Sequence, residues 1–297
     1  MNRLRNVWSN PWGKPRFLVL FTALYLVWSI VPILVAVRFS FNEGRSRSTA
    51  QGWSTRWYTG DPDLSVLHDP TLSTARLQSM RLAAIAVLVT VPLGVALAIG
   101  LTRWKGRGAA TSRGISLATL VTPEIVMGTA LFLVFVHLLN FIPLGTIAQA
   151  IGHITFSLVF VVIIVRARLL AIGREYEEAA RDLGASTMQA LRLALLPMLV
   201  PAVVASAIIV FAISMDDFVI SQFLSSGTAT DTVPVRIYST GRTAPTPAVN
   251  ALATLTLGFT MVVTIVGFIV WKAVRSVRGG TGSGMQEFAT LDADTIA

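Results

Sequence analysis

Arg166–Val203 reads RARLLAIGREYEEAARDLGASTMQALRLALLPMLVPAV, and this stretch decides how the chain is organised. It is a long, partly charged segment between two apolar stretches. Glu175–Leu183 consists largely of strong helix formers, and Gly184 fits the left-handed position that ends many helices. Ser186 or Thr187 is then placed to cap a second helix. We therefore expect two helices within this loop.

The second of these helices carries an apolar stripe that ends at a proline. The stripe consists of Met188, Leu191, Leu195 and Leu196. Proline lacks the N–H that a helix interior needs, so we expect Pro197 to break the helix before the next apolar stretch. The pattern fits an amphipathic hairpin on lipid headgroups as well as a surface that another protein binds. Periodicity alone does not separate these two interpretations.

The composition of the 297 residues indicates a membrane protein. Hydrophobic residues make up 54% of the chain and charged residues only 13%, whereas a soluble domain carries about 25% charged residues. The chain has no cysteine, which excludes disulfides and thiolate metal sites. Its three histidines, His68, His137 and His153, are scattered and predict no metal site. We interpret His137 and His153, which flank a short outer hairpin, as interfacial residues.

Six stretches approach the roughly 20 apolar residues that cross a bilayer. They are Phe17–Val37, Leu82–Leu101, Ile115–Leu139, Leu144–Val165, Pro201–Leu224 and Ala248–Trp271. Lysine and arginine gather before the first stretch, between the second and third, between the fourth and fifth, and after the sixth. The positive-inside rule then places both termini in the cytoplasm. The net charge of +9 is explained by this topology and by anionic lipids, without nucleic acid.

A spaced motif within the loop resembles the EAA motif of ABC importer permeases. In that motif Glu-Ala-Ala is followed by three residues, a glycine, nine residues, an aliphatic residue, any residue, and Leu-Pro. The matching residues are Glu178, Ala179, Ala180, Gly184, Leu196 and Pro197. Ala194 stands at the aliphatic position and is smaller than the family usually has there. The resemblance favours the docking interpretation of the loop over the headgroup interpretation.

The resemblance implies an all-α membrane protein with the type I ABC importer permease fold, six transmembrane helices and a cytoplasmic coupling helix. We expect a cytoplasmic segment 1–16, a permease domain 17–278 and a disordered cytoplasmic tail 279–297. The loop, about residues 166–198, is called the coupling loop below. In the family it docks in a cleft of a separate ATP-binding subunit, where small residues allow close approach and Glu178 accepts hydrogen bonds from the partner.

Other stretches are similar to importers of the polyamine (spermidine/putrescine) type, specifically to the second permease of the pair. They are Arg56–Gly60, Thr122–Gly128, His153–Leu169, Ser214–Gly227, Val233–Ser239 and Thr246–Leu255. The family shares these features with importers of other small solutes. An organic amine, an amino-acid-like compound, a phosphonate or a metal ion therefore stands as an alternative substrate.

Three carboxylates lie inside the predicted spans, where a charge costs about 2.5–3.5 kcal/mol. Glu124 lies about ten residues into the third span, near the membrane midplane. Asp216 and Asp217 lie late in the fifth span, and adjacent helical residues point about 100° apart, so only one can face a central path. These carboxylates are candidates for a path that attracts a cationic solute. Alternatively, Glu124 caps a helix break after Pro123 and the aspartates bond to a neighbouring helix.

No GxxxxGK[ST] phosphate loop occurs in the chain, so we expect a non-catalytic subunit whose energy comes from another chain. The resemblance implies two ATP-binding subunits that hold ATP and magnesium, a second homologous permease and an extracellular or periplasmic solute-binding protein. It places the complex in the bacterial inner membrane, with no cofactor and no metal in this chain. The competing class is an ion-coupled secondary transporter, which inverted repeats with interrupted helices would favour.

Overall fold

The computed structural model describes residues 16–46, 49–103, 106, 114, 121–243 and 246–278. Five helices in this part of the chain are long and apolar enough to cross a membrane. They are Phe17–Ser40, Pro70–Arg103, Thr146–Ile172, Thr187–Asp216 and Pro247–Ala273. These helices confirm the all-α membrane architecture that the sequence predicts. The expected cytoplasmic segment 1–16, except Arg16, and the expected tail 279–297 lie outside the described residues.

The third predicted span, Ile115–Leu139, is described only in part. Residues 115–120 lie outside the description, and the described remainder contains a shorter apolar helix, Glu124–Leu138. This helix consists of α5 Glu124–Leu133 and the π-helical turn η2 Val134–Leu138.

The chain divides into two compact units, residues 1–69 with 240–254, and residues 70–239 with 255–297. The first unit contains α2 Arg16–Ser40 and the π-helical turn η1 Arg56–Gly60, and it takes in the start of α12 Pro247–Arg278. The apolar side chains of α2 are exposed over most of its length, which suits a helix surrounded by lipid or by another subunit.

The loop after α2 is folded around a buried tryptophan. Trp57 of η1 is fully buried, and its indole N–H donates to the backbone oxygen of Asn42 over 2.6 Å. The guanidinium group of Arg56 donates two hydrogen bonds, of 2.9 and 2.7 Å, to one carboxylate oxygen of Asp61. The predicted outer loop is therefore an ordered element with its own small core.

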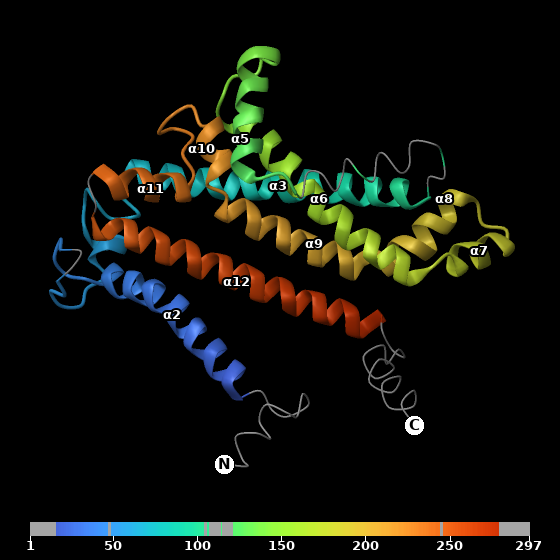
Figure 1. Cartoon of the computed structure of the whole chain (residues 1–297), viewed down its shortest axis with the longest axis horizontal. Helices are drawn as coiled ribbons and strands as arrows, with labels where there is room; N and C mark the ends of the chain where they lie inside the picture. The colour runs from blue at the N-terminus through green and yellow to red at the C-terminus, as the bar shows by residue number, and fades with distance from the viewer. Residues whose placement is uncertain are drawn as a thin grey trace, which may run out of the picture. The chain divides into compact units, whose positions relative to one another are not determined.

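The second unit is built on three helices that pack against one another: α3 Pro70–Arg103, α6 Thr146–Ile172 and α9 Leu196–Asp216 (Figure 1). Their shared core is aliphatic and includes Val91 and Leu101 of α3, Val165 of α6 and Leu199 of α9. Gly94 allows a close approach of α3 to α6, because a Cβ atom there would lie 2.6 Å from Val161.

Shorter helices surround this core. They are α7 Glu175–Asp182, α8 Thr187–Gln189, the π-helical turn η3 Ala190–Leu195, α10 Val219–Leu224 and α11 Val233–Thr243. α10 packs against both α5 and α6. A Cβ atom at Gly128 of α5 would lie 2.9 Å from Phe223, and one at Gly152 of α6 would lie 2.6 Å from Ile220. Glycine at these two positions lets α10 lie close to both helices.

Candidate functional site

The coupling loop forms the helical hairpin that the sequence predicts. Its first helix, α7, ends at Gly184, whose φ of +90° lies in the left-handed region. The N–H of Gly184 donates to the oxygen of Arg181, and the N–H of Ala185 donates to the oxygen of Ala180. This pair of bonds is the Schellman arrangement, which satisfies the last carbonyls of a helix. Among the described residues no atom lies within 4 Å of a Cβ placed on Gly184, so the backbone turn is the feature of this part of the chain that requires glycine.

The second helix begins with a capping box at Ser186. The Ser186 hydroxyl accepts a hydrogen bond from the N–H of Gln189 at 3.3 Å, and the Gln189 side chain accepts one from the N–H of Ser186 at 2.8 Å. Two orphan donors of the helix start are thereby satisfied. Of the two predicted caps, Ser186 fills this role and Thr187 is the first helical residue.

The expectation that Pro197 breaks the second helix is wrong. Helix runs without interruption from Thr187 to Asp216, and Pro197 lies in the first turn of α9. Just before it, the N–H of Leu196 donates to the oxygen of Leu191, a π-type bond that shifts the hydrogen-bond register. The missing proline N–H falls at this change of register, where a helix tolerates it.

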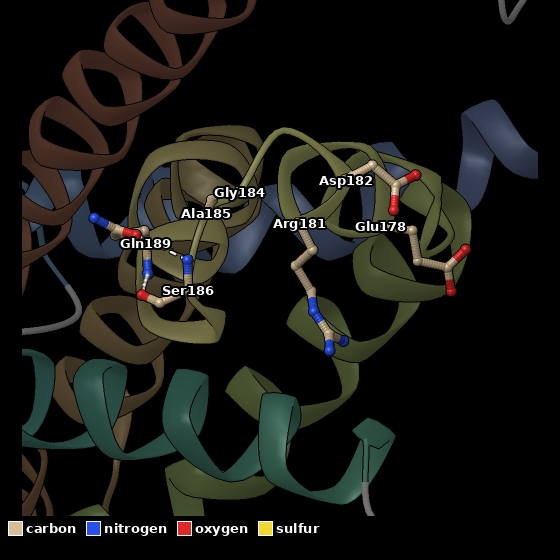
Figure 2. A pocket seen from close by; sticks show the side chains of 7 residues that line it. All are labelled: Glu178, Arg181, Asp182, Gly184, Ala185, Ser186 and Gln189. Carbon is tan, nitrogen blue, oxygen red and sulfur yellow. Dashed lines mark hydrogen bonds between the residues drawn. The ribbon is translucent and has the colours of Figure 1, made fainter.

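The two arms of the hairpin enclose a wide-mouthed pocket of about 580 Å³. Figure 2 shows Glu178, Arg181 and Asp182 on α7, with Ser186 and Gln189 on the facing arm. Gly184 and Ala185 connect the two arms and complete the lining. Within the described part of the chain, the charged side chains of α7 that line this pocket form no ion pair.

The rest of the motif is arranged around this pocket. Glu178 and Ala179 are exposed, while Ala180, Leu196 and Pro197 are half-buried. Leu183, at the end of α7, is 91% exposed, and Leu193 of η3 is 77% exposed. The hairpin therefore offers apolar side chains, charges and a recess to the outside of the molecule.

An ion pair connects the hairpin to the helix core. Arg103, in the last turn of α3, donates a hydrogen bond from its guanidinium group to the carboxylate of Glu177 on α7. Both side chains are about three-quarters buried. This ion pair connects α7 directly to the end of α3.

The predicted carboxylates lie where the fifth span is interrupted. The expectation that both aspartates belong to one helix is wrong, because α9 ends at Asp216 and Asp217 has extended backbone angles, φ −61° and ψ 117°. The chain then restarts as α10. Asp216 is exposed and Asp217 is buried. The break in the helix, rather than the 100° helical step, separates the two side chains.

Glu124 faces this break from α5. The helix α5 begins at Glu124, directly after Pro123, which is its N-cap residue with φ −55° and ψ 135°. Pro123 therefore occupies the cap position, and Glu124 lies in the first turn. Glu124 is half-buried and faces the carboxyl groups of Asp217 and Asp216. We call Glu124, Asp216 and Asp217 the carboxylate cluster.

The interpretation of His153 as an interfacial residue is wrong, because only 1% of its side chain is exposed. Its ring lies against the helix break: Nδ1 is 2.7 Å from the hydroxyl of Ser214, and Nε2 is 3.1 Å from Oδ2 of Asp217. Ser221 of α10 completes the group, with its hydroxyl 3.0 Å from Nε2. His137, by contrast, is exposed on η2.

One signal in the sequence points to this buried network. Gln149, His153 and Ser157 follow one another at intervals of four within an otherwise apolar helix, and all three are buried. Gln149 donates to the backbone oxygens of Ser221 and Thr230, each at 3.0 Å. Polar residues on one face of a span indicate a polar partner inside the protein, because lipid offers none. Of these three residues only His153 was interpreted from the sequence, and the interval of four was not recognised.

Comparison with known proteins agrees with this architecture. The putrescine transport system permease protein PotI of Escherichia coli (strain K12) is 37% identical over 276 residues, which cover 91% of this chain and 93% of PotI. The spermidine/putrescine transport system permease protein PotC of the same strain is 34% identical over 261 residues, 88% of this chain and 95% of PotC.

A chain in the crystal structure of a bacterial alginate ABC transporter, in complex with its alginate-pentasaccharide-bound periplasmic protein, has a similar fold. The TM-score is 0.68 at 17% identity, and the match covers 95% of this chain and 98% of that chain. Residues 90–276, well over half of the chain, match the family of binding-protein-dependent transport system inner membrane components. This chain, a multi-pass membrane protein, belongs to that family.

Proposed function

We propose that this chain is the membrane permease of an ATP-driven importer and forms part of the path of a polyamine such as putrescine or spermidine. The carboxylate cluster is the observation that carries the choice of substrate. Oδ1 of Asp217 is buried and has no hydrogen-bond partner among the described residues, although the group lies beside Glu124. Carboxylates that face one another in an apolar segment repel unless one of them is protonated or a cation lies between them. An ammonium group supplies that charge and the missing hydrogen bond.

The similarity to PotI and PotC supports the same substrate, because both relatives are putrescine transport permeases. Another small solute, such as an organic amine, an amino-acid-like compound, a phosphonate or a metal ion, is the alternative. Membership of a binding-protein-dependent family favours the importer over an ion-coupled secondary transporter. This chain itself is then non-catalytic and carries no cofactor.

In this proposal the ATP-binding subunit docks on the coupling loop, and ATP hydrolysis is coupled to transport through this contact. The pocket between α7 and α8 is open to the outside, and its exposed Glu178 and Leu183 offer one charged and one apolar contact to an ATP-binding subunit. Two such subunits, with ATP and magnesium, are expected to serve this chain and a second homologous permease. A solute-binding protein delivers the solute at the opposite face of the membrane. The complex lies in the bacterial inner membrane, with both termini of this chain in the cytoplasm.

The test is ATP-dependent uptake of labelled putrescine and spermidine by proteoliposomes that hold the complete complex. Glu124→Gln and Asp217→Asn each remove one charge-assisted hydrogen bond, worth about 1.5–3 kcal/mol, so the half-saturating concentration rises about tenfold to a hundredfold. Asp63→Asn, which changes an exposed carboxylate in the first unit, is the matched control and leaves uptake as it was.

Two results would refute this function. Uptake that follows an ion gradient and ignores ATP rules out the importer. The cationic path is ruled out if the ATP-dependent complex does not take up polyamines, or if neither Glu124→Gln nor Asp217→Asn changes the uptake.

A further inference from the structure

His153 is held by contacts to three separate elements of the fold. The ring comes from the middle of α6, Ser214 from the last turn of α9, and Asp217 and Ser221 from the break and from α10. Its side chain is 1% exposed, and that of Asp217 is 3% exposed. A buried imidazole with partners at both nitrogens has one orientation, because any rotation breaks a bond that water cannot replace.

The hydrogen bonds around His153 show which of its ring nitrogens carries a hydrogen. The hydroxyl of Ser221 donates its single hydrogen to Oδ2 of Asp217 over 2.7 Å. It must therefore accept in its 3.0 Å contact with His153, so Nε2 carries a hydrogen. Nε2 itself lies 3.1 Å from Oδ2 of Asp217, so the same hydrogen is shared with that carboxylate. When the ring is neutral, Nδ1 accepts, and the hydroxyl of Ser214 donates to it over 2.7 Å.

The two oxygens of Asp217 consequently differ in their hydrogen bonds. Oδ2 accepts from the N–H of Ser221 at 2.8 Å and from the Ser221 hydroxyl, and it shares the Nε2 hydrogen of His153 with that hydroxyl, at an Nε2–Oδ2 distance of 3.1 Å. Oδ1 is buried, has no hydrogen-bond partner among the described residues and belongs to the group that faces Glu124. The contacts to Oδ2 fix the rotation of the carboxylate and therefore the position of Oδ1.

We propose that His153 is a positioning residue for solute binding: it holds Asp217 at the helix break so that Oδ1 faces Glu124 and binds an ammonium group of the solute. The proposal rests on the proposed function, because it requires that the carboxylate cluster contacts the solute. His153 itself touches no solute. Its effect passes through Asp217, whose second oxygen it occupies.

The residue also connects α6 to the end of α9, so loss of uptake alone does not separate positioning from stability. Positioning and stability are separated by substitutions that retain different parts of the histidine ring and its hydrogen bonds. His153→Gln places an amide N–H near the position of Nε2 and keeps the bond to Asp217. His153→Asn reaches only the position of Nδ1 and Ser214. His153→Phe keeps the ring volume and removes both bonds.

The experiment measures uptake of labelled putrescine by the complete complex in proteoliposomes, with the amount of assembled complex and its melting temperature measured in parallel. We expect His153→Gln to stay within about threefold of the unaltered protein in half-saturating concentration. We expect Asn and Phe to raise it at least tenfold at equal assembly. His137→Phe changes an exposed histidine of η2 and is the matched control, with no expected effect on uptake.

A double-mutant cycle with Asp217→Asn tests whether the effect passes through that carboxylate. We expect His153→Phe to add less than twofold once Asp217 is altered. The proposal is overturned if the Phe variant has normal half-saturation, if all losses follow reduced assembly, or if the two substitutions act independently. If Glu124→Gln and Asp217→Asn both leave putrescine uptake unchanged, the proposed function fails and this inference fails with it. If only the histidine variants behave normally, the function stands.

Discussion

Substitutions at Gly184 distinguish two roles of this residue, in the local backbone turn of the coupling loop and in its docking to another subunit. The residue has a φ of +90°, where a residue with a Cβ atom costs roughly 1–2 kcal/mol. Part of this cost is offset, because replacing glycine also restricts the unfolded chain by about 0.4–1 kcal/mol. The net cost for Gly184→Ala is about 1 kcal/mol, and it is smaller for Gly184→Asn because asparagine tolerates left-handed angles. A cost of this size changes the local opening equilibrium about fivefold.

Hydrogen exchange measures this cost at the end of α7. The N–H groups of residues 184 and 185 close that end by their bonds to Arg181 and Ala180, so both amides of Gly184→Ala exchange about fivefold faster. Gly184→Trp has the same backbone cost, because φ is unchanged and no atom of the described residues lies within 4 Å of its Cβ position. Its exchange therefore matches that of the alanine variant.

The tryptophan variant differs in the complete complex. Its large side chain projects beside the pocket that the proposed ATP-binding subunit fills, so solute-stimulated ATP hydrolysis falls to the basal rate. The alanine and asparagine variants keep most of the stimulation. Normal stimulation with tryptophan at this position would contradict the docking role. Exchange that is faster by several orders of magnitude with alanine would show that packing, and not backbone angle, requires glycine here.

Two further predictions concern packing and pH. Gly94→Ala forces α3 away from a side chain of α6 that lies 2.6 Å from the new Cβ, so the melting temperature falls by the equivalent of about 1–3 kcal/mol. Gly100→Ala is the control and is neutral or stabilising, because no atom of the described residues lies within 4 Å of its Cβ position. Equal effects of the two substitutions on the melting temperature would refute the close contact at Gly94. The pKa of Asp61 is held below its usual value by the backbone N–H of Leu64 and then by Arg56. The folded outer loop therefore keeps this stabilisation above the ordinary aspartate pKa, about 3.9, and loses it as the pH falls through the lowered value. Tryptophan fluorescence during acid titration measures the loss, and Asp61→Asn should abolish this contribution; an unchanged profile in that variant would contradict the assignment.

The parts of this protein that follow from neighbouring residues were predictable. The hairpin of the coupling loop, the left-handed Gly184 and the cap at Ser186 depend on a few residues along one stretch of chain, and the structure confirms them. The membrane architecture depends on runs of apolar residues, and five of the six predicted spans are long helices. The continuation of the helix through Pro197 was not predictable from proline alone, because it depends on a π-type change of register.

The sequence by itself determined the class of the protein, since apolar length, charge asymmetry and the spaced motif are all local or periodic properties. Only the tertiary structure decided which carboxylate faces which partner. Gly152 and Gly128 let α10 approach α6 and α5, and this packing buries His153 and turns Asp217 toward Glu124. His153 and Asp217 are 64 positions apart along the chain, and no pattern within one helix reports a contact between them. Their meeting depends on how three helices pack, which is a property of the folded chain as a whole.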